Sequence, residues 1–434
     1  MHKVEQHLIM TTPTLFKDQV VSNYNTNRLL TEDRIVHDWY RFVLSYPAHL
    51  VRDYISQWNI GPGQRLLDPF SGTGTSLVEC KRLGVESVGI EANPAAQFAS
   101  NTKLDWSPDP HLLAAHAESI ADVAAQRLAA WNCNPLTLPP DGMKLLITNS
   151  ISPVPLHKIL VLRQCIEEMS DPQFNCHERL ALAKTAVTTA SNLKFGPEVG
   201  ISTQKTDADV IGAWMTNVHQ MASDLRMVSN YVPIQATSLL GDAREAETLI
   251  TPASIDAVFT SPPYPNEKDY SRTTRLEMVL LGFAEDKAQL QAIKRVLLRS
   301  NTRGVYQGDA DDAWVNEIPQ VQEIAHEIER RRLEMGKTSG FERLYAKVTK
   351  LYFGGMARHL ASLRPLLRPG AHLGYVVGDQ ASYLRVMIRT GELLGQIAET
   401  LGYELVRIDL FRTRLATATK EMMREEVVVL RWNP

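Results

Sequence analysis

The chain of 434 residues is long enough for one large domain with inserts, or for two or three domains. Its 44% hydrophobic and 22% charged residues are typical of an ordinary globular protein. No apolar run is long enough to cross a membrane, and residues 1–19 lack the charged-then-apolar pattern of a signal peptide, so we expect a cytoplasmic protein. The net charge of −3 neither favours nor excludes nucleic acid, because such an enzyme needs only local basic patches.

The first part of the chain predicts the opening of a doubly wound α/β fold. Residues 1–30 are polar and mixed, which indicates an arm, and residues 32–57 predict helix with a break or a helix start at Pro47. RLLDPF (65–70) then predicts a buried strand, SGTGTSLVECKRLG (71–84) a glycine turn and helix, and VESVGIEAN (85–93) a second strand. This succession of strand, turn, helix and strand is typical of parallel sheets covered by helices.

Two stretches interrupt the α/β pattern. Residues 106–230 have mainly helical spacing and predict an inserted helical subdomain, and residues 284–350 form a second interruption. The chain returns to strands at 232–243, 254–264 and 368–379, followed by a helix at 386–402. Two last strands, 403–413 and 425–432, are candidates for an antiparallel hairpin. The expected divisions are 1–105, 106–230, 231–283, 284–350 and 351–434.

The four cysteines give no sign of a metal centre. Cys80, Cys133, Cys165 and Cys176 form no C-x-x-C pair, and Cys176-His177 has no matching second pair of ligands. We therefore expect no structural zinc, no catalytic metal and no disulfide framework.

The glycine turn predicts a binding site for a cofactor that contains adenosine but no phosphate. Gly72 and Gly74 allow the backbone to approach a ligand closely, and Thr75 is a helix-capping residue type. Leu77 stands where a third glycine would complete a pyrophosphate-binding motif. The next strand ends at Glu91, whose carboxylate can accept hydrogen bonds from both ribose hydroxyls.

The sequence Ser261-Pro262-Pro263-Tyr264 follows a buried strand directly. Its prolines stiffen the backbone at the strand end, where sheets of this kind bind ligands. An exocyclic amine on a nucleic-acid base is a poor nucleophile because its lone pair is delocalised into the ring. The Ser261 hydroxyl and the Pro262 carbonyl can accept its N–H groups and aim the lone pair, while Tyr264 offers a face for a flipped base.

Together, D-P-F-x-G-x-G-T at residues 68–75 and S-P-P-Y at 261–264 resemble the motifs of the amino-methylating DNA methyltransferases. The resemblance covers about 35–105, 235–283 and 350–432. It implies an α/β, Rossmann-like S-adenosylmethionine-dependent methyltransferase fold, with a doubly wound mixed sheet and, here, a helical insert. It also implies cofactor contacts, with Glu91 at the ribose, Asp242 near the adenine amino group, and the remaining residues at or near the methionine part: Asp68, Pro69, Phe70, Gly72, Gly74 and Thr75.

Within this family a serine in the first position of the second motif goes mostly with methylation of cytosine N4. The resemblance therefore implies base flipping from double-stranded DNA and direct transfer at a specific sequence, by an enzyme that is either the functional companion of a restriction endonuclease or solitary. Three alternatives stay open: adenine N6 methylation, methylation of an RNA base amine, and an inactive methyltransferase-like nucleic-acid-binding protein. The chain has no Pro-Cys dipeptide, which argues against cytosine C5 methylation because that reaction needs a Pro-Cys nucleophile.

Contacts to DNA are expected from basic residues after the second motif. No acidic residue occurs between Asp286 and Asp309, so the region 284–350 is the candidate for target recognition. The alternative is a solvated helix face followed by a loop, with helix caps and surface charges before it. The candidate DNA-binding residues are Arg272, Arg275, Lys294, Arg295, Arg299 and Arg303.

Overall fold

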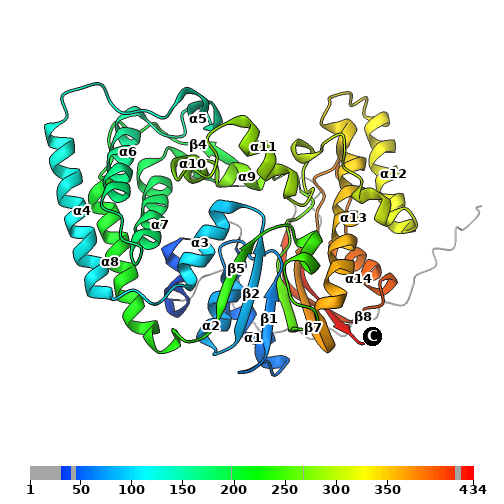
Figure 1. The fold of residues 1–434 in the computed structure, drawn as a ribbon. Coiled ribbons are helices and arrows are strands. Elements are labelled where there is room, and N and C mark those ends of the chain that lie inside the picture. The colour runs from blue at the N-terminus through cyan, green and yellow to red at the C-terminus, as the bar shows by residue number, and fades with distance from the viewer. Residues whose placement is uncertain (1–30, 41–44, 197, 267, 416–421) are drawn as a thin grey trace, which may run out of the picture.

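The protein is built around a seven-stranded sheet (Figure 1). The structure is a computed structural model, and it describes residues 31–40, 45–196, 198–266, 268–415 and 422–434. The strand order is β5-β2-β1-β6-β7-β9-β8. All neighbours up to β7 are parallel, whereas β9 is antiparallel to both β7 and β8. This confirms the predicted mixed sheet and its final hairpin. The strands are β1 Arg65–Asp68, β2 Glu86–Glu91, β5 Ala236–Leu240, β6 Ile255–Thr260, β7 Leu367–Gly378, β8 Glu404–Leu415 and β9 Met422–Trp432.

The strand order reverses between β1 and β6. β1 pairs with β2 on one edge and with β6 on the other, through Leu66 opposite Ala257 and Leu67 opposite Val258. The connections on the two sides of this point leave in opposite directions, so a crevice opens beyond the carboxyl ends of the two strands. Both sequence motifs begin at these two strand ends, which brings them side by side.

Helices cover both faces of the sheet, which explains why its central strands are almost continuously apolar. Leu66 packs in a cluster with α1 (Ala48–Gln57), whereas its neighbour Leu67 packs in a cluster with α13 (Tyr345–Leu363) and α14 (Thr390–Thr400). Successive side chains of a strand point to opposite faces, so each face has its own core. Helices α2 (Thr75–Arg82) and α3 (Pro94–Leu104) complete the cofactor half.

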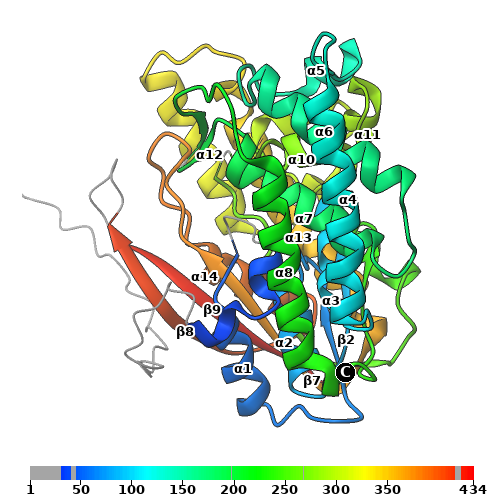
Figure 2. The ribbon, with the colours of Figure 1, turned by 90° about the vertical axis from the view of Figure 1, so that its left-hand side faces the viewer.

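The predicted helical insert is present and lies to one side of the sheet (Figures 1 and 2). Its helices share one apolar core with Leu77 and Val78 of α2, so the insert packs directly on the cofactor half. A short hairpin, β3 (Leu193–Phe195) with β4 (Val199–Ile201), was not predicted. The helices are α4 Pro110–Ala130, α5 Pro140–Leu145, α6 Pro153–Glu168, α7 Asn175–Thr185 and α8 Val210–Val228.

The second interruption contains α11 (Lys287–Val296) and α12 (Pro319–Glu334), and is preceded by α9 (Tyr270–Thr273) and α10 (Arg275–Leu280). Helix α13 then begins at Tyr345, so the expected division at residue 350 falls inside a buried helix. At Gly354 this helix meets the turn Asp311–Val315 so closely that a Cβ would lie 1.8 Å from the Asp311 carbonyl oxygen.

The segment before β1 contains less helix than expected. Thr31–Arg34 and His37–Trp39 are short 3₁₀ turns, and α1 begins directly after Pro47, as predicted. Trp39 and the Val36 backbone both donate to the Asp224 carboxylate of α8, which ties this segment to the insert. The expected arm (1–30) and residues 41–44 of the expected helix lie outside the described residues. No helix in the described part of the chain is long and apolar enough to span a membrane.

Candidate active site

A cavity of about 800 Å³ lies at the carboxyl ends of the strands and joins the two sequence motifs. Its wall contains every predicted catalytic and cofactor residue except Asp68 and Gly74. The predicted residues on the wall are Pro69, Phe70, Gly72, Thr75, Glu91, Asp242, Ser261, Pro262, Pro263 and Tyr264.

The two glycines of the turn have different structural roles. Gly72 has a φ of 51°, lines the cavity and has nothing within 4 Å of an added Cβ, so a side chain there would occupy open space at the wall. Gly74 has a φ of 83°, but its added Cβ would lie 2.5 Å from the Ser100 hydroxyl of α3. Gly72 thus serves the cavity, whereas Gly74 lets the turn pack against the next helix.

Asp68 lies beneath the cavity wall and is fully buried. Its carboxylate accepts hydrogen bonds from the Thr260 hydroxyl at 2.6 Å and the Tyr46 hydroxyl at 3.1 Å. Burial raises the pKa of Asp68 to about 6, although these hydrogen bonds act in the opposite direction. Asp68 therefore joins the ends of β1 and β6, and fixes the start of the turn through the Phe70 N–H from beneath the cavity wall.

Glu91 stands at the end of β2 with its carboxylate on the cavity. Its two oxygens accept from the backbone N–H groups of Gly72 and Asn93, each at 2.8 Å. Burial raises the pKa of Glu91 to about 7, against the effect of these two hydrogen bonds. The remaining lone pairs suit two neighbouring hydroxyls, as on a ribose. Lys268 and Arg412, the two cations on the described wall, come from other segments, so the glycine turn suits an uncharged ribose rather than phosphates.

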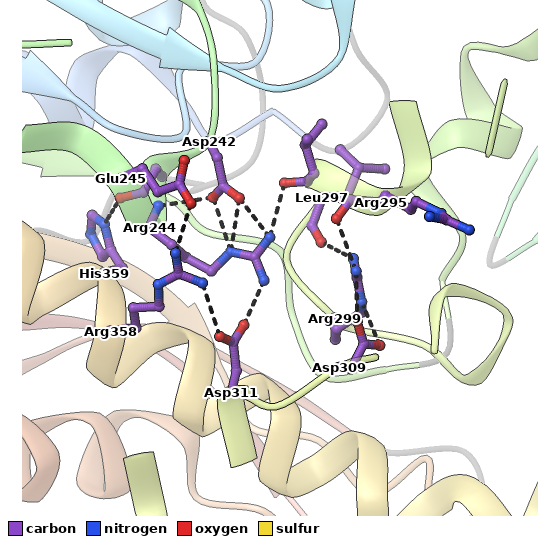
Figure 3. Close-up of polar contacts among 12 residues, drawn as sticks. Asp242, Arg244, Glu245, Arg295, Leu297, Arg299, Asp309, Asp311, Arg358 and His359 are labelled. Atoms are coloured by element: carbon purple, nitrogen blue, oxygen red, sulfur yellow. Dashed lines mark hydrogen bonds and ion pairs between the residues drawn. The ribbon is translucent and has the colours of Figure 1, made fainter. Parts of the chain in front are cut away.

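Asp242 also lines the cavity, but its carboxylate is engaged by Arg244 (Figure 3). Arg244 donates from its backbone N–H and from Nε to Oδ1, each at 2.9 Å, and from Nη2 to Oδ2 at 2.6 Å. Its Nη1 reaches Asp311 at 2.5 Å, and Asp311 in turn pairs with Arg358. A carboxylate has about four acceptor positions, so most of those on Asp242 are used within the protein.

Phe70 is held on the wall by a neutral histidine. Its ring lies edge-on to His359, with 4.9 Å between ring centroids, and His359 is hydrogen-bonded to the Ala243 carbonyl oxygen and the Tyr375 hydroxyl. Burial lowers the pKa of His359 to about 4, which keeps it uncharged at neutral pH.

The S-P-P-Y segment continues directly from β6. The Ser261 hydroxyl donates to the Val376 carbonyl oxygen of β7 at 3.1 Å, which leaves its lone pairs as acceptors. The Tyr264 N–H donates to the Tyr270 hydroxyl at 3.1 Å. Gly378 lies against the Tyr264 ring, because a Cβ there would be 3.1 Å from Cε2. Two neighbouring segments, β7 and the start of α9, thus fix the geometry of this motif.

The final hairpin supplies cavity residues that the sequence motifs did not indicate. Phe411 and Arg412 of β8, with Met423 and Glu425 of β9, form part of the wall. The loop residues Ser45, Tyr46 and Pro47 line it as well. The i, i+2 spacing of Met423 and Glu425 is the one local signal for these wall residues. It predicts that the two side chains share a face of the strand, but not that this face is the one towards the cavity.

The six candidate DNA-binding residues fall into two groups in the structure: those engaged within the protein and those at least partly open to solvent. Arg299 is 5% exposed and pairs with Asp309, and Lys294 pairs with Asp269, so these two are engaged within the protein. Arg275 donates to carbonyl oxygens of Ser271 and of Leu145 in the insert. Arg295 and Arg303 are exposed, and Arg272 is half-buried. The basic stretch thus offers solvent fewer cations than its sequence indicates.

The sheet and the two motifs define the fold class of the S-adenosylmethionine-dependent methyltransferases. No family model matches the chain. It is 24% identical to Type II methyltransferase M.BsoBI of Geobacillus stearothermophilus, over 98% of this chain and 88% of that protein. It is 23% identical to Type II methyltransferase M.AvaI of Nostoc sp. (strain PCC 7120 / SAG 25.82 / UTEX 2576), over 88% and 82%. These similarities confirm the resemblance to the methyltransferase family.

Two further similarities are more limited. A stretch of 52 residues, 12% of this chain and 10% of the relative, is 35% identical to Type II methyltransferase M.MjaII of Methanocaldococcus jannaschii. The solved structure titled "Crystal structure of TrmN from Thermus thermophilus" aligns with a TM-score of 0.31 at 11% identity. That alignment covers 92% of this chain and 52% of the other chain.

Proposed function

We propose that this protein is a DNA methyltransferase that transfers a methyl group from S-adenosylmethionine to the N4 amine of cytosine within a specific sequence. The observation that carries the proposal is the adjacency of the two motifs. β1 and β6 are neighbouring parallel strands, and the glycine turn and Ser261-Pro262-Pro263-Tyr264 follow them into one cavity. The similarity to Type II methyltransferases supports methyl transfer, and the serine of S-P-P-Y favours the cytosine amine.

The cavity wall fits S-adenosylmethionine at several points. Glu91 would accept the ribose hydroxyls, Gly72 leaves room for the methionine part, and Phe70 gives an apolar surface. When bound, this cofactor supplies a methyl group on a sulfonium. Asp242 stays in the proposed site as a wall residue whose carboxylate Arg244 orients.

The chain's own residues would activate the amine by position. The Ser261 hydroxyl and the Pro262 carbonyl would accept the two amine N–H groups and turn the nitrogen lone pair towards the glycine turn. Tyr264 would stack on the flipped base. Since neighbouring segments fix Ser261 and Tyr264, and the proline rings stiffen the backbone between them, the rate gain is assigned mainly to orientation.

The proposal is tested by expressing the protein in a host without DNA modification, followed by nucleoside analysis and methylation-aware sequencing. We expect N4-methylcytosine in genomic DNA at one short recurring sequence. N6-methyladenine instead would favour the adenine alternative, and methylation of RNA in competition assays would favour an RNA enzyme. Cofactor binding without transfer to any nucleic acid would identify an inactive binding protein.

Cofactor affinity is expected to depend on pH through Glu91. The folded protein holds the pKa of Glu91 at about 7, so the carboxylate that accepts ribose hydroxyls is lost as pH falls through that value. Affinity for S-adenosylmethionine should therefore weaken between pH 8 and pH 6 (roughly one unit either side of that pKa).

Isothermal titration calorimetry of the wild type, Glu91→Gln and Glu86→Gln measures this dependence. Glu86 is an exposed residue at the other end of the same strand, so its variant should keep the wild-type pH profile. Glu91→Gln should bind S-adenosylmethionine more weakly than the wild type, and its affinity should change little between pH 8 and pH 6 (roughly one unit either side of the wild-type pKa). An unaltered profile in Glu91→Gln would show that another group titrates.

A further inference from the structure

The β8–β9 hairpin forms a wall of the cavity beside the S-P-P-Y motif. Its pairing is irregular between Leu410 and Arg412, so that Leu410 lies opposite Glu426 and Arg412 opposite Glu425. Side chains normally alternate between the faces of a strand, but this bulge at Phe411 allows Phe411 and Arg412 both to line the cavity. A bulge beside a site commonly re-aims a side chain, and the residue re-aimed here is an arginine.

Arg412 is held by a cross-strand ion pair. Its Nε and Nη2 both lie 2.6 Å from Oε2 of Glu425, and the two side chains are 27% and 10% exposed. Glu425 also pairs across the sheet with Gly378, the glycine that lies against Tyr264. A Cβ at Gly378 would be 3.1 Å from Tyr264 Cε2 and 3.3 Å from Glu425 Cγ. The ion pair therefore lies next to the proposed stacking surface for the base.

The chemistry of the base distinguishes cytosine from adenine at this position. Ser261 and Pro262 would hold the amine, and the ring atoms that follow the amine along the same edge then face another part of the wall. In cytosine these are N3 and O2, two neighbouring acceptors, whereas in adenine they are the N1 acceptor and a C–H. A guanidinium presents five N–H donors in a fixed plane, and the pairing with Glu425 uses only Nε and one N–H of Nη2.

We propose that Arg412, held in place by Glu425, donates hydrogen bonds to N3 and O2 of the flipped base and so makes the site selective for cytosine over adenine. This inference rests on the proposed function and adds to it a specificity-determining residue outside both sequence motifs. The local reason is that the bulge at Phe411 directs Arg412 into the cavity, and Glu425 fixes the plane of its guanidinium.

The test uses duplex DNA that carries the sequence found by methylation mapping, with either cytosine or 3-deazacytosine at the target position. The analogue keeps the amine and O2 but replaces N3 by a C–H. We expect the wild type to lose about 10- to 100-fold in kcat/KM on the analogue, the range for one good base contact. Arg412→Met should have a low kcat/KM on cytosine. Its kcat/KM should fall by less than about threefold more on the analogue, since the contact between residue 412 and N3 is already absent.

Three controls keep the result interpretable. Arg431→Met removes an exposed arginine of the same hairpin outside the cavity wall and should retain the wild-type response. Glu425→Gln should show a smaller loss of kcat/KM on the analogue than the wild type does. Arg412→Met should bind S-adenosylmethionine with wild-type affinity, which also shows that this variant folds. If Arg412→Met is as sensitive to the analogue as the wild type, the inference is wrong. If the wild type fails to methylate cytosine at all, the proposed function is wrong instead.

Discussion

Ser261→Ala and Tyr264→Ala are each expected to lose at least about 100-fold in kcat while binding S-adenosylmethionine with nearly wild-type affinity. The physical reason is that, in the proposed mechanism, both residues orient the base rather than the cofactor. Without the Ser261 hydroxyl, one amine N–H loses its fixed acceptor. Without the Tyr264 ring, the flipped base loses the surface on which it stacks. Single-turnover methyl transfer and calorimetric cofactor titration measure the two quantities separately.

Two matched variants define what these losses mean. Tyr264→Phe keeps the aromatic face and should retain most of the rate. Ser254→Ala removes a hydroxyl at the opposite end of β6, where it bonds only to the nearby Thr251 carbonyl oxygen, and should be unaffected. If Ser261→Ala and Tyr264→Ala both turn over at the wild-type rate, this motif is not catalytic.

Arg244→Met is expected to destabilise the protein by about 3–5 kcal/mol, the cost of removing one partner from a buried ion pair. The Arg244 side chain is 8% exposed and pairs with Asp242 and Asp311, which are 13% and 11% exposed. Methionine fills a similar volume but leaves both carboxylates with fewer donors. Because Asp242 lies on the cavity wall, cofactor affinity should fall as well.

Equilibrium unfolding in urea measures the loss of stability, with Arg368→Met as the comparison. Arg368 is 47% exposed, and its partner Asp256, which is 12% exposed, keeps the Arg65 N–H as a second donor, so we expect the loss of this solvent-screened pair to cost about 1 kcal/mol or less. Equal effects from the two variants would contradict the view that the Arg244 network supports the site. A stable Arg244→Met protein with weak cofactor binding would restrict its role to orienting Asp242.

The sheet was largely predictable because its strands are short apolar runs that end in turn residues. RLLD and IDAVFT are buried on both faces, and such runs belong to central parallel strands. The helix boundaries before β1 were less predictable. Residues 31–39 form 3₁₀ turns because Val36 and Trp39 bond to Asp224, almost two hundred positions later in the chain, which no local pattern reveals.

The sequence by itself determined the succession of strands along the chain, the glycine turn, the proline-stiffened corner and the expectation that both motifs lie at the carboxyl ends of strands. These are local properties, set by side-chain period, backbone restrictions and the topology that parallel strands require. Only the tertiary structure decided which polar groups were already engaged. Asp242 and Arg299 carry charges in the expected places, but each is already paired within the protein: Asp242 with Arg244 two positions further on, and Arg299 with Asp309 across the loop that follows it. Arg412 joins Glu425 on the cavity wall because one bulge re-aims β8. An ion pair depends on distance in space, and sequence separation does not encode it.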